Sequence, residues 1–142
     1  MNTLQINEEM KNFSCYKGTF SKNLLPQKII NERPIAFIIN TDNNDKPGEH
    51  WVSIFISRSN TCQYFDSFGR YPLQEIINFL KINNIKYLTY NTKILQSFYS
   101  NTCGAFCILF VKLRCSNFSF KNFINLFTNN NISNDELAVK IL

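Results

Sequence analysis

Apolar runs separated by short polar stretches predict three neighbouring strands in the first half of the chain. The segment PIAFIIN (34–40) is almost wholly apolar, WVSIFIS (51–57) alternates, and CQYFD (62–66) follows after a turn. The stretches TDNNDKPG (41–48) and SRSNT (57–61) are rich in turn-forming residues. Strands joined by such short loops pair in opposite directions, so we expect an antiparallel sheet.

Helical spacing dominates the second half of the chain. Apolar residues recur at three- and four-residue intervals in LQEIINFLKI (73–82), which predicts an amphipathic helix. The segment CGAFCILFVKLRC (103–115) is apolar on nearly every side, the pattern of a helix buried inside a domain. SFKNFINLF (119–127) is amphipathic, and Ser133 to Glu136 form a capping-box pattern that predicts the start of a last helix.

Shorter elements complete the prediction. They are a helix at 3–12, a turn at 15–20 (CYKGTF), a short helix around Pro26–Ile30, a strand at 85–91 (IKYLTYN) and a short strand at 93–96 (KILQ). The mixture predicts an α+β fold in a single domain, 1–142.

The composition favours a packed globular domain. The chain has 142 residues, 44% of them hydrophobic, and contains 14 Phe. A chain of this size buries roughly two thirds of the surface that its unfolded form exposes. Residues 1–18 show no basic segment followed by an apolar run, and the most apolar run, 103–113, is far shorter than the ~20 residues that cross a bilayer. We therefore expect an intracellular, non-secreted protein without membrane contact.

Cysteines and charge add two weaker indications. The five cysteines show no framework spacing, and an odd number cannot all pair within one chain, which favours a reducing compartment where thiols stay free. The net charge of +5 is compatible with non-specific DNA binding, but the basic residues are scattered. With one histidine and no CxxC pair, no metal site is expected.

Cys103 is the candidate nucleophile. A thiolate reacts and a thiol does not, so the site must lower a pKa near 8.5, and a helix N-terminus beside a histidine does so. Cys103 stands where the apolar helix is predicted to begin, after the polar, turn-forming SFYSNT. The next residue, Gly104, is small enough to let a substrate backbone approach.

Three other residues can complete such a site. His50, the only histidine, precedes one predicted strand and can exchange a proton with Cys103. Asp66 ends the neighbouring strand and can orient the imidazole. The side-chain amide of Gln96, beside the backbone N–H of Cys103, can donate to a developing oxyanion.

Taken one at a time, these residues have plainer explanations. A single histidine such as His50 is more often a surface or loop-edge residue, and Asp66 in DSFG is an ordinary turn former. Cys103 alone would more often be a buried thiol, and Gln96 carries no signal by itself. The ordered combination of the four departs from chance.

The motifs around these residues resemble the adenovirus maturation protease (adenain) family. They are HW at 50–51, FDSFG at 65–69 and QSFYSNTCGAFC at 96–107, and GTFSKNLLP (18–26) is similar to the family's opening GT turn. The resemblance covers most of the chain, and the wider clan includes proteases that remove ubiquitin-like proteins. Homologues of this kind occur in virophages and virus-like transposons, and the residue usage, typical of A/T-rich codons, suits a virophage such as mavirus.

The resemblance implies a papain-like fold in which a central, mostly antiparallel sheet packs against a buried helix that starts at the catalytic cysteine. The implied roles are base for His50, orienting carboxylate for Asp66, oxyanion donor for Gln96 and nucleophile for Cys103. Trp51 would pack beneath the site, although a strand core position explains it equally well. Family members cleave after a small residue, commonly Gly, so the same preference is expected here.

We therefore expect a monomeric cysteine endopeptidase that processes viral capsid or core precursors during virion maturation, in the virion and the viral factory of the infected cell. No cofactor is required. The adenovirus enzyme is activated by a disulfide-linked peptide, but the corresponding stretch 83–96 contains no cysteine, so any DNA or peptide activator would not be disulfide-linked here. The alternatives are a deconjugase of ubiquitin-like proteins, a clan-related acetyltransferase and a catalytically silent DNA-binding module.

Overall fold

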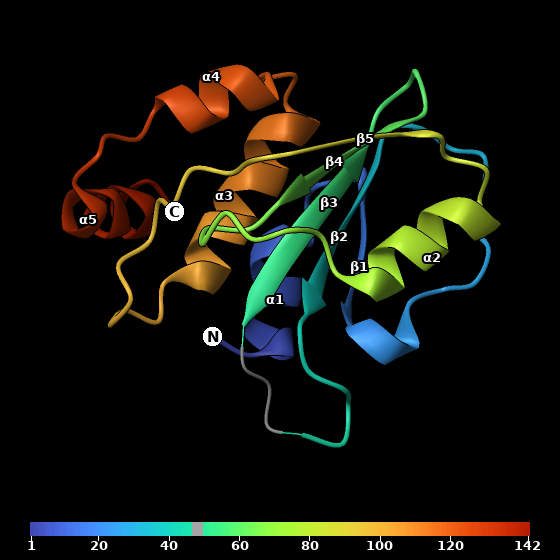
Figure 1. Ribbon diagram of the computed structural model, residues 1–142, viewed down its shortest axis with the longest axis horizontal. Coiled ribbons are helices and arrows are strands. Elements are labelled where there is room, and N and C mark those ends of the chain that lie inside the picture. The colour runs from blue at the N-terminus through green and yellow to red at the C-terminus, as the bar shows by residue number, and fades with distance from the viewer. Residues whose placement is uncertain (47–49) are drawn as a thin grey trace.

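The computed structural model describes residues 1–46 and 50–142, and it places one five-stranded sheet between helices (Figure 1). In chain order the elements are α1 (Thr3–Met10), β1 (Tyr16–Ser21), η1 (Lys22–Leu24), β2 (Ile35–Asn40), β3 (Trp51–Ile56), β4 (Thr61–Phe65), α2 (Gln74–Ile82), β5 (Tyr87–Tyr90), α3 (Cys103–Cys115), α4 (Phe120–Asn125) and α5 (Asn131–Ile141).

The strands lie in the order β1-β2-β3-β4-β5. The inner pairs, β2 with β3 and β3 with β4, are antiparallel, as the short connecting loops predict. The outer pairs, β1 with β2 and β4 with β5, are parallel. A parallel pair needs a crossover connection, and α2 lies in the crossover between β4 and β5. The sheet is therefore mixed, with antiparallel pairing only in its centre.

Side chains of the inner strands alternate between two apolar clusters, one on each face of the sheet. On β2, Ala36 and Ile38 belong to the cluster that includes α1, α3, α4 and α5. Ile35, Phe37 and Ile39 belong to the cluster that includes α2. Figure 1 shows α2 and α3 on opposite sides of the strands. Burial on both faces explains why this segment is a continuous apolar run and shows no alternation.

The helix α3, predicted at 103–115, is confirmed with the same bounds. Its first nine residues, 103–111, are all buried, because α3 packs against the central strands and against α1, α4 and α5. A helix enclosed in this way has no polar face, which accounts for its composition. Lys112 and Arg114 stand in its last turn, where cations interact favourably with the carbonyl end of the helix.

Two short elements near the N-terminus differ from the prediction. The segment 15–20, predicted as a turn, is largely strand β1. Every residue of β1 is half-buried, so the strand lacks the alternation that would identify it. Among the described residues, 26–30 form no helix, and the short helical turn lies earlier, at η1.

The segment 93–96, predicted as a short strand, forms none among the described residues. The backbone N–H groups of Leu95 and Gln96 donate instead to the carbonyl of Ser67, at 2.8 and 3.2 Å. This irregular segment therefore lies against the turn that follows β4.

The last helix begins earlier than its predicted capping box. Asn130 is the N-cap of α5, and its side chain accepts a hydrogen bond from the backbone N–H of Ser133 at 3.1 Å. Ser133 and Glu136 therefore lie inside the helix, and the capping-box prediction is wrong. An asparagine is as good an N-cap as a serine, so the local pattern could not separate the two positions.

Cys15 and Cys115 form a disulfide across a sequence separation of 100 residues. The expectation that all thiols stay free is therefore wrong for this pair. Spacing along the sequence carries no information about a pair so far apart. Cys62, Cys103 and Cys107 are free and buried.

The loop predicted at 41–48 joins β2 to β3, and its residues 47 and 48 lie outside the described residues. Across the part of the chain that the structure describes, none of the helices has both the length and the apolar character that crossing a bilayer requires.

Candidate active site

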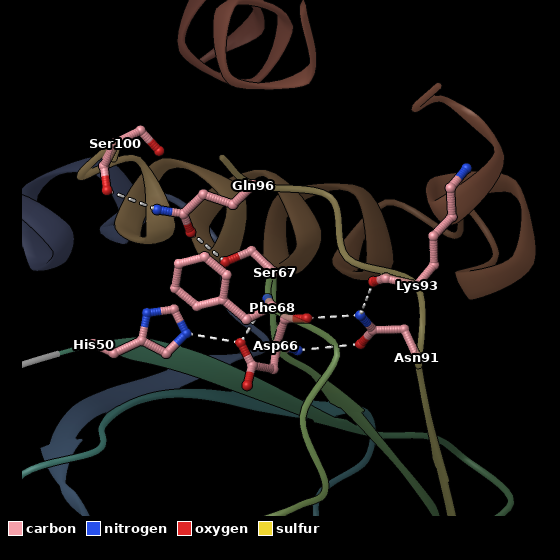
Figure 2. Close-up of polar contacts among 8 residues, drawn as sticks. All are labelled: His50, Asp66, Ser67, Phe68, Asn91, Lys93, Gln96 and Ser100. Atoms are coloured by element: carbon pink, nitrogen blue, oxygen red, sulfur yellow. Dashed lines mark hydrogen bonds and ion pairs between the residues drawn. The ribbon is translucent and has the colours of Figure 1, made fainter. Parts of the chain in front are cut away.

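His50 and Asp66 meet at one end of the sheet. His50 immediately precedes β3, and Asp66 immediately follows β4. Because these strands are antiparallel, the start of β3 and the end of β4 lie at the same end of the sheet. His50 Nε2 lies 2.7 Å from Asp66 Oδ1, and both side chains are buried (Figure 2). The sequence-predicted pair is therefore brought together, with the other ring nitrogen of His50 turned away from Asp66.

The position of Asp66 is fixed by its own turn and by Asn91. The backbone N–H of Phe68 donates to Asp66 Oδ1 at 2.8 Å, in a turn of the type that aspartate favours. The side chain of Asn91 accepts from the Asp66 backbone N–H at 3.1 Å and donates to the Asp66 carbonyl at 2.6 Å. Asn91 is itself buried. Its side chain makes the two hydrogen bonds to the Asp66 backbone that the backbone of a neighbouring strand would otherwise make.

Cys103 also interacts with the imidazole of His50, and each of the two side chains shifts the pKa of the other. Burial by itself lowers the pKa of His50, but the hydrogen bonds and charges of Asp66 and Cys103 outweigh it and raise the pKa to about 9. The imidazole is therefore protonated near neutral pH.

The Cys103 thiol responds in the opposite direction. Burial alone raises its pKa, but the hydrogen bond and charge of His50, with backbone hydrogen bonds from Trp51 and Gly104, bring the pKa of Cys103 below its ordinary value. Cys103 is also the first residue of α3, where the helix dipole favours negative charge. The arrangement therefore favours a thiolate beside an imidazolium.

Gln96 lies in the same site. Its side chain is buried, with Oε1 accepting from the Ser67 hydroxyl at 2.5 Å and Nε2 donating to the Ser100 carbonyl at 3.1 Å. Figure 2 shows the amide held between these two contacts. One of the two N–H bonds of Nε2 is used by Ser100, which leaves the second for a ligand in the cleft.

Asp135 on α5 anchors the loop that enters α3. It accepts hydrogen bonds from the Ser97 hydroxyl at 2.6 Å and from the Thr102 hydroxyl at 2.8 Å. Ser100 and Thr102 are in turn joined through their hydroxyls at 3.0 Å. The polar loop between Gln96 and Cys103 is therefore fixed at both ends, which fixes the distance between amide and sulfur.

An aromatic side chain covers the imidazole. The ring of Phe68 lies against that of His50, with centroids 4.9 Å apart, and its neighbour in the stack is Phe98, at 5.9 Å. Arg70 lies over the Phe68 ring at 4.9 Å. Phe98 is largely exposed, so this stack extends from the buried histidine to the protein surface.

A cleft of about 640 Å³ opens at Cys103, His50 and Gln96. Trp51 lines this cleft and also belongs to the apolar core, so it occupies both of the positions considered for it, at the site and in the strand core. Its indole N–H donates to the Met1 carbonyl at 3.0 Å. A Cβ on Gly104 would lie 3.2 Å from Met1 atoms and 3.5 Å from Trp51, so the space above Gly104 is narrow.

Sequence reasoning missed several residues that hold the site in place. Ser67 and Phe68 lie within the FDSFG motif, so their closeness to Asp66 in the chain is the available signal. Asn91 and Asp135 carry no local signal, because their partners lie 25 or more residues away in the chain. Within the described residues, no group of three or more His, Cys, Asp or Glu side chains is arranged to hold a metal ion.

The chemistry available here is nucleophilic attack with proton transfer. A desolvated thiolate can attack an electrophilic carbon, and the adjacent imidazolium can protonate a leaving group. The Gln96 amide and the helix N-terminus supply donors for negative charge that develops on an oxygen.

Comparison with known proteins finds viral relatives that are named as cysteine proteases. Over 99 residues the chain is 29% identical to a protein named as a cysteine protease from African swine fever virus, in a match covering 62% of this chain and 36% of that protein. It is 28% identical, with the same coverage, to the corresponding protein of another isolate, named as a SUMO-1 cysteine protease. This chain spans about a third of the length of these curated relatives. No protein-family model matches the chain.

Two solved structures share the fold. The crystal structure of the African swine fever virus protease superposes with a TM-score of 0.66 at 19% identity, covering 94% of this chain and 63% of that one. ChlaDub1 from Chlamydia trachomatis gives 0.53 at 15% identity, covering 76% and 58%. The predicted α+β fold, with a central sheet packed against a buried helix that begins at Cys103, is confirmed, but the outer strand pairs of the sheet are parallel.

Proposed function

We propose that this protein is a cysteine peptidase. The observation that carries the proposal is the grouping of Asp66, His50 and Cys103. Asp66 hydrogen-bonds to His50, and His50 lowers the pKa of the Cys103 thiol, which stands at a helix N-terminus and lines a cleft. The names of the viral relatives, which are cysteine proteases, support the same activity. Neither a metal nor an organic cofactor is part of the proposal, because thiolate and imidazolium supply both the nucleophile and the acid.

The first half of the reaction follows from the positions of the groups. The Cys103 thiolate attacks the scissile carbonyl carbon, and the C=O electron pair moves onto the oxygen. The second N–H of Gln96 and the Cys103 backbone N–H stabilise that oxyanion. The His50 imidazolium then donates its proton to the leaving nitrogen, the C–N bond breaks, and a thioester remains on Cys103.

The second half regenerates the site. His50, now neutral, takes a proton from a water molecule, and the resulting hydroxide attacks the thioester carbonyl. The C–S bond breaks, the acid product leaves, and Cys103 is again a thiolate beside an imidazolium. Asp66 keeps the imidazole in one orientation throughout.

The substrate is proposed to be an extended segment with a small residue, such as Gly, at the cleaved bond. The narrow space between Trp51, Met1 and Gly104 supports this size limit. The relative named as a SUMO-1 cysteine protease favours a ubiquitin-like protein as the source of that segment. Deconjugation or processing of such a protein is therefore better supported than the capsid-precursor cleavage expected from the resemblance to adenain.

Cleavage of viral capsid or core precursors is the second candidate, because relatives are viral proteases. If this second candidate holds, the protein is proposed to lie in the virion and the viral factory. Its proposed origin is then a virophage or a related element. Both curated relatives described above come from African swine fever virus, so a virophage source has no support from them.

The chain is proposed to work as a monomer without a covalently linked activator. Asp66, His50 and Cys103 already interact within one chain. The remaining cysteines are either paired with each other or fully buried, which supports the absence of a disulfide-linked peptide. Non-specific DNA binding stays a proposal that rests on the net charge of +5.

A substrate panel tests these proposals. Purified chain is incubated with ubiquitin-like precursors, with capsid-derived precursors and with acetyl-CoA plus an acceptor peptide, in parallel with the variants Cys103→Ala and Cys107→Ala. We expect peptide-bond cleavage by wild type and by Cys107→Ala, and none by Cys103→Ala. Equal cleavage by Cys103→Ala, or acetyl-CoA consumption without cleavage, would contradict the peptidase proposal.

A further inference from the structure

Ser67 contacts Gln96 through both its backbone and its side chain. The Ser67 carbonyl accepts from the Gln96 backbone N–H at 3.2 Å and from that of Leu95 at 2.8 Å. Its hydroxyl donates to Gln96 Oε1 at 2.5 Å. The Ser67 side chain is fully buried, so water does not compete for this hydrogen bond.

The two contacts of the amide select one of its two orientations. A glutamine amide carries an acceptor oxygen and a donor NH₂ group, and only the NH₂ group can stabilise an oxyanion. Ser67 engages Oε1 and the Ser100 carbonyl engages Nε2. Turning the amide over would set Oε1 against the Ser100 carbonyl, and two acceptors repel each other.

Ser67 also follows Asp66 directly, in a tight turn. The Gly69 N–H donates to the Asp66 carbonyl at 2.8 Å, and Gly69 has a φ of +64°, a conformation that glycine adopts at low cost. One turn after β4 thus holds the His50 partner and the Gln96 partner at adjacent positions.

We propose that Ser67 is a positioning residue for the reaction: its hydroxyl anchors Gln96 Oε1 so that the free N–H of the amide stays directed at the oxyanion formed on the Cys103 adduct. This role rests on the proposed peptidase function. Two neighbouring residues then have different tasks. Asp66 acts on Cys103 through His50, and Ser67 acts only on the oxyanion donor Gln96.

The separation gives a distinctive expected result for Ser67→Ala. Losing an oxyanion donor outright typically costs about 10²- to 10³-fold in kcat. Ser67→Ala leaves the donor present but held by one contact, so we expect kcat to fall roughly ten- to a hundredfold with little change in KM. The rate of Cys103 alkylation by iodoacetamide and its pH dependence should stay as in wild type, because alkylation forms no oxyanion.

The experiment compares wild type, Ser67→Ala, Gln96→Ala and the double variant by kcat, KM and Cys103 alkylation. Ser53→Ala is the matched control, since Ser53 is equally buried but its hydroxyl lies near Cys107 and makes no hydrogen bond to Gln96. We expect the double variant to be no slower than Gln96→Ala alone. Thermal unfolding of each variant checks that the fold is retained.

Four outcomes would overturn the proposal. Unchanged kcat in Ser67→Ala, or losses that multiply in the double variant, would show that Ser67 does not act through Gln96. A parallel loss of alkylation rate would show that Ser67 acts on the nucleophile. A wild type that alkylates at Cys103 but hydrolyses nothing would overturn the peptidase function itself, and the role of Ser67 with it.

Discussion

Asn91 holds Asp66 by two hydrogen bonds to its backbone, one to the N–H at 3.1 Å and one to the carbonyl at 2.6 Å. The carboxylate that orients His50 is thus positioned by a side chain from the segment that follows β5, 25 residues further along the chain. The imidazole depends on this contact although Asn91 does not touch it.

Asn91→Ala should therefore impair both folding and activity. It leaves the buried N–H of Asp66 without its partner, which costs about 1–3 kcal/mol of unfolding free energy. A displaced carboxylate also supports the His50 imidazolium less, so kcat/KM should fall by roughly tenfold or more. Urea denaturation and steady-state kinetics check this, with the exposed Asn78→Ala as control. Wild-type kcat/KM in folded Asn91→Ala would refute the role.

The pH dependence follows from the opposite pKa shifts of the two reacting groups. The pKa of His50, which burial lowers and its contacts with Asp66 and Cys103 raise, stands at about 9. The imidazolium thus contributes stability that is fully present below about pH 6.5 and is lost as pH rises through about 9. Cys103, whose folded-state pKa is lowered, contributes stability as a thiolate, and this contribution is lost as pH falls through the lowered pKa. We expect kcat/KM to form a bell whose alkaline limb lies near pH 9.

Asp66→Asn tests the cause of that limb. Without the carboxylate the His50 pKa falls, so the alkaline limb should move to lower pH and the maximum rate should drop. The control is Glu136→Gln, which removes an exposed carboxylate on α5. If the limb stays near pH 9 in Asp66→Asn, the carboxylate is not what holds the proton on the imidazole.

The Cys15–Cys115 disulfide should stabilise the fold without taking part in the reaction. It joins the segment before β1 to the C-terminal end of α3, across 100 residues. A disulfide typically contributes about 2–4 kcal/mol, and the loss of chain entropy in the unfolded state is greater for a loop as long as this one. Urea denaturation with and without reductant should show this difference in wild type and none in Cys15→Ser/Cys115→Ser. Identical midpoints in wild type would contradict it.

Gly104→Ala should affect substrate binding more than stability. The new Cβ would lie 3.2 Å from Met1 and 3.5 Å from Trp51, so it narrows the space next to Cys103. Alanine is the better helix former by about 1 kcal/mol, which offsets the tighter contact. We expect the free energy of unfolding to stay within about 1 kcal/mol of the wild-type value. We expect kcat/KM to fall at least roughly tenfold. Gly69→Ala is the contrast: its Cβ would lie 2.5 Å from a backbone oxygen, so it should destabilise the fold.

Local patterns predicted the parts of the molecule that depend on neighbours in sequence. The bounds of α3 followed from its apolar run, and the places of β2, β3 and β4 from the turns between them. His50 and Asp66 could be paired because a short hairpin joins their strands. Gln96 and Cys103 lie close together in the chain, and their roles followed from thiolate and oxyanion chemistry together with the resemblance to a known family.

The remaining features depend on contacts that local patterns do not encode. Strand β1 is half-buried along its whole length, so it shows neither alternation nor an apolar run. Its parallel pairing with β2 requires a crossover connection, and no local pattern in the sequence predicts one. The disulfide spans 100 residues. Asn91 and Asp135 act on the site from elements 25 and 38 residues away from Asp66 and Ser97.

The most direct measurement is the pH-dependent alkylation of each free thiol by iodoacetamide, mapped by mass spectrometry in wild type and in His50→Ala. We predict that Cys103 is labelled first near neutral pH while the buried Cys62 and Cys107 lag, and that His50→Ala slows Cys103 by roughly tenfold or more and moves its reaction to higher pH. Labelling of Cys62 ahead of Cys103, or a Cys103 rate unchanged in His50→Ala, would contradict the thiolate–imidazolium pair.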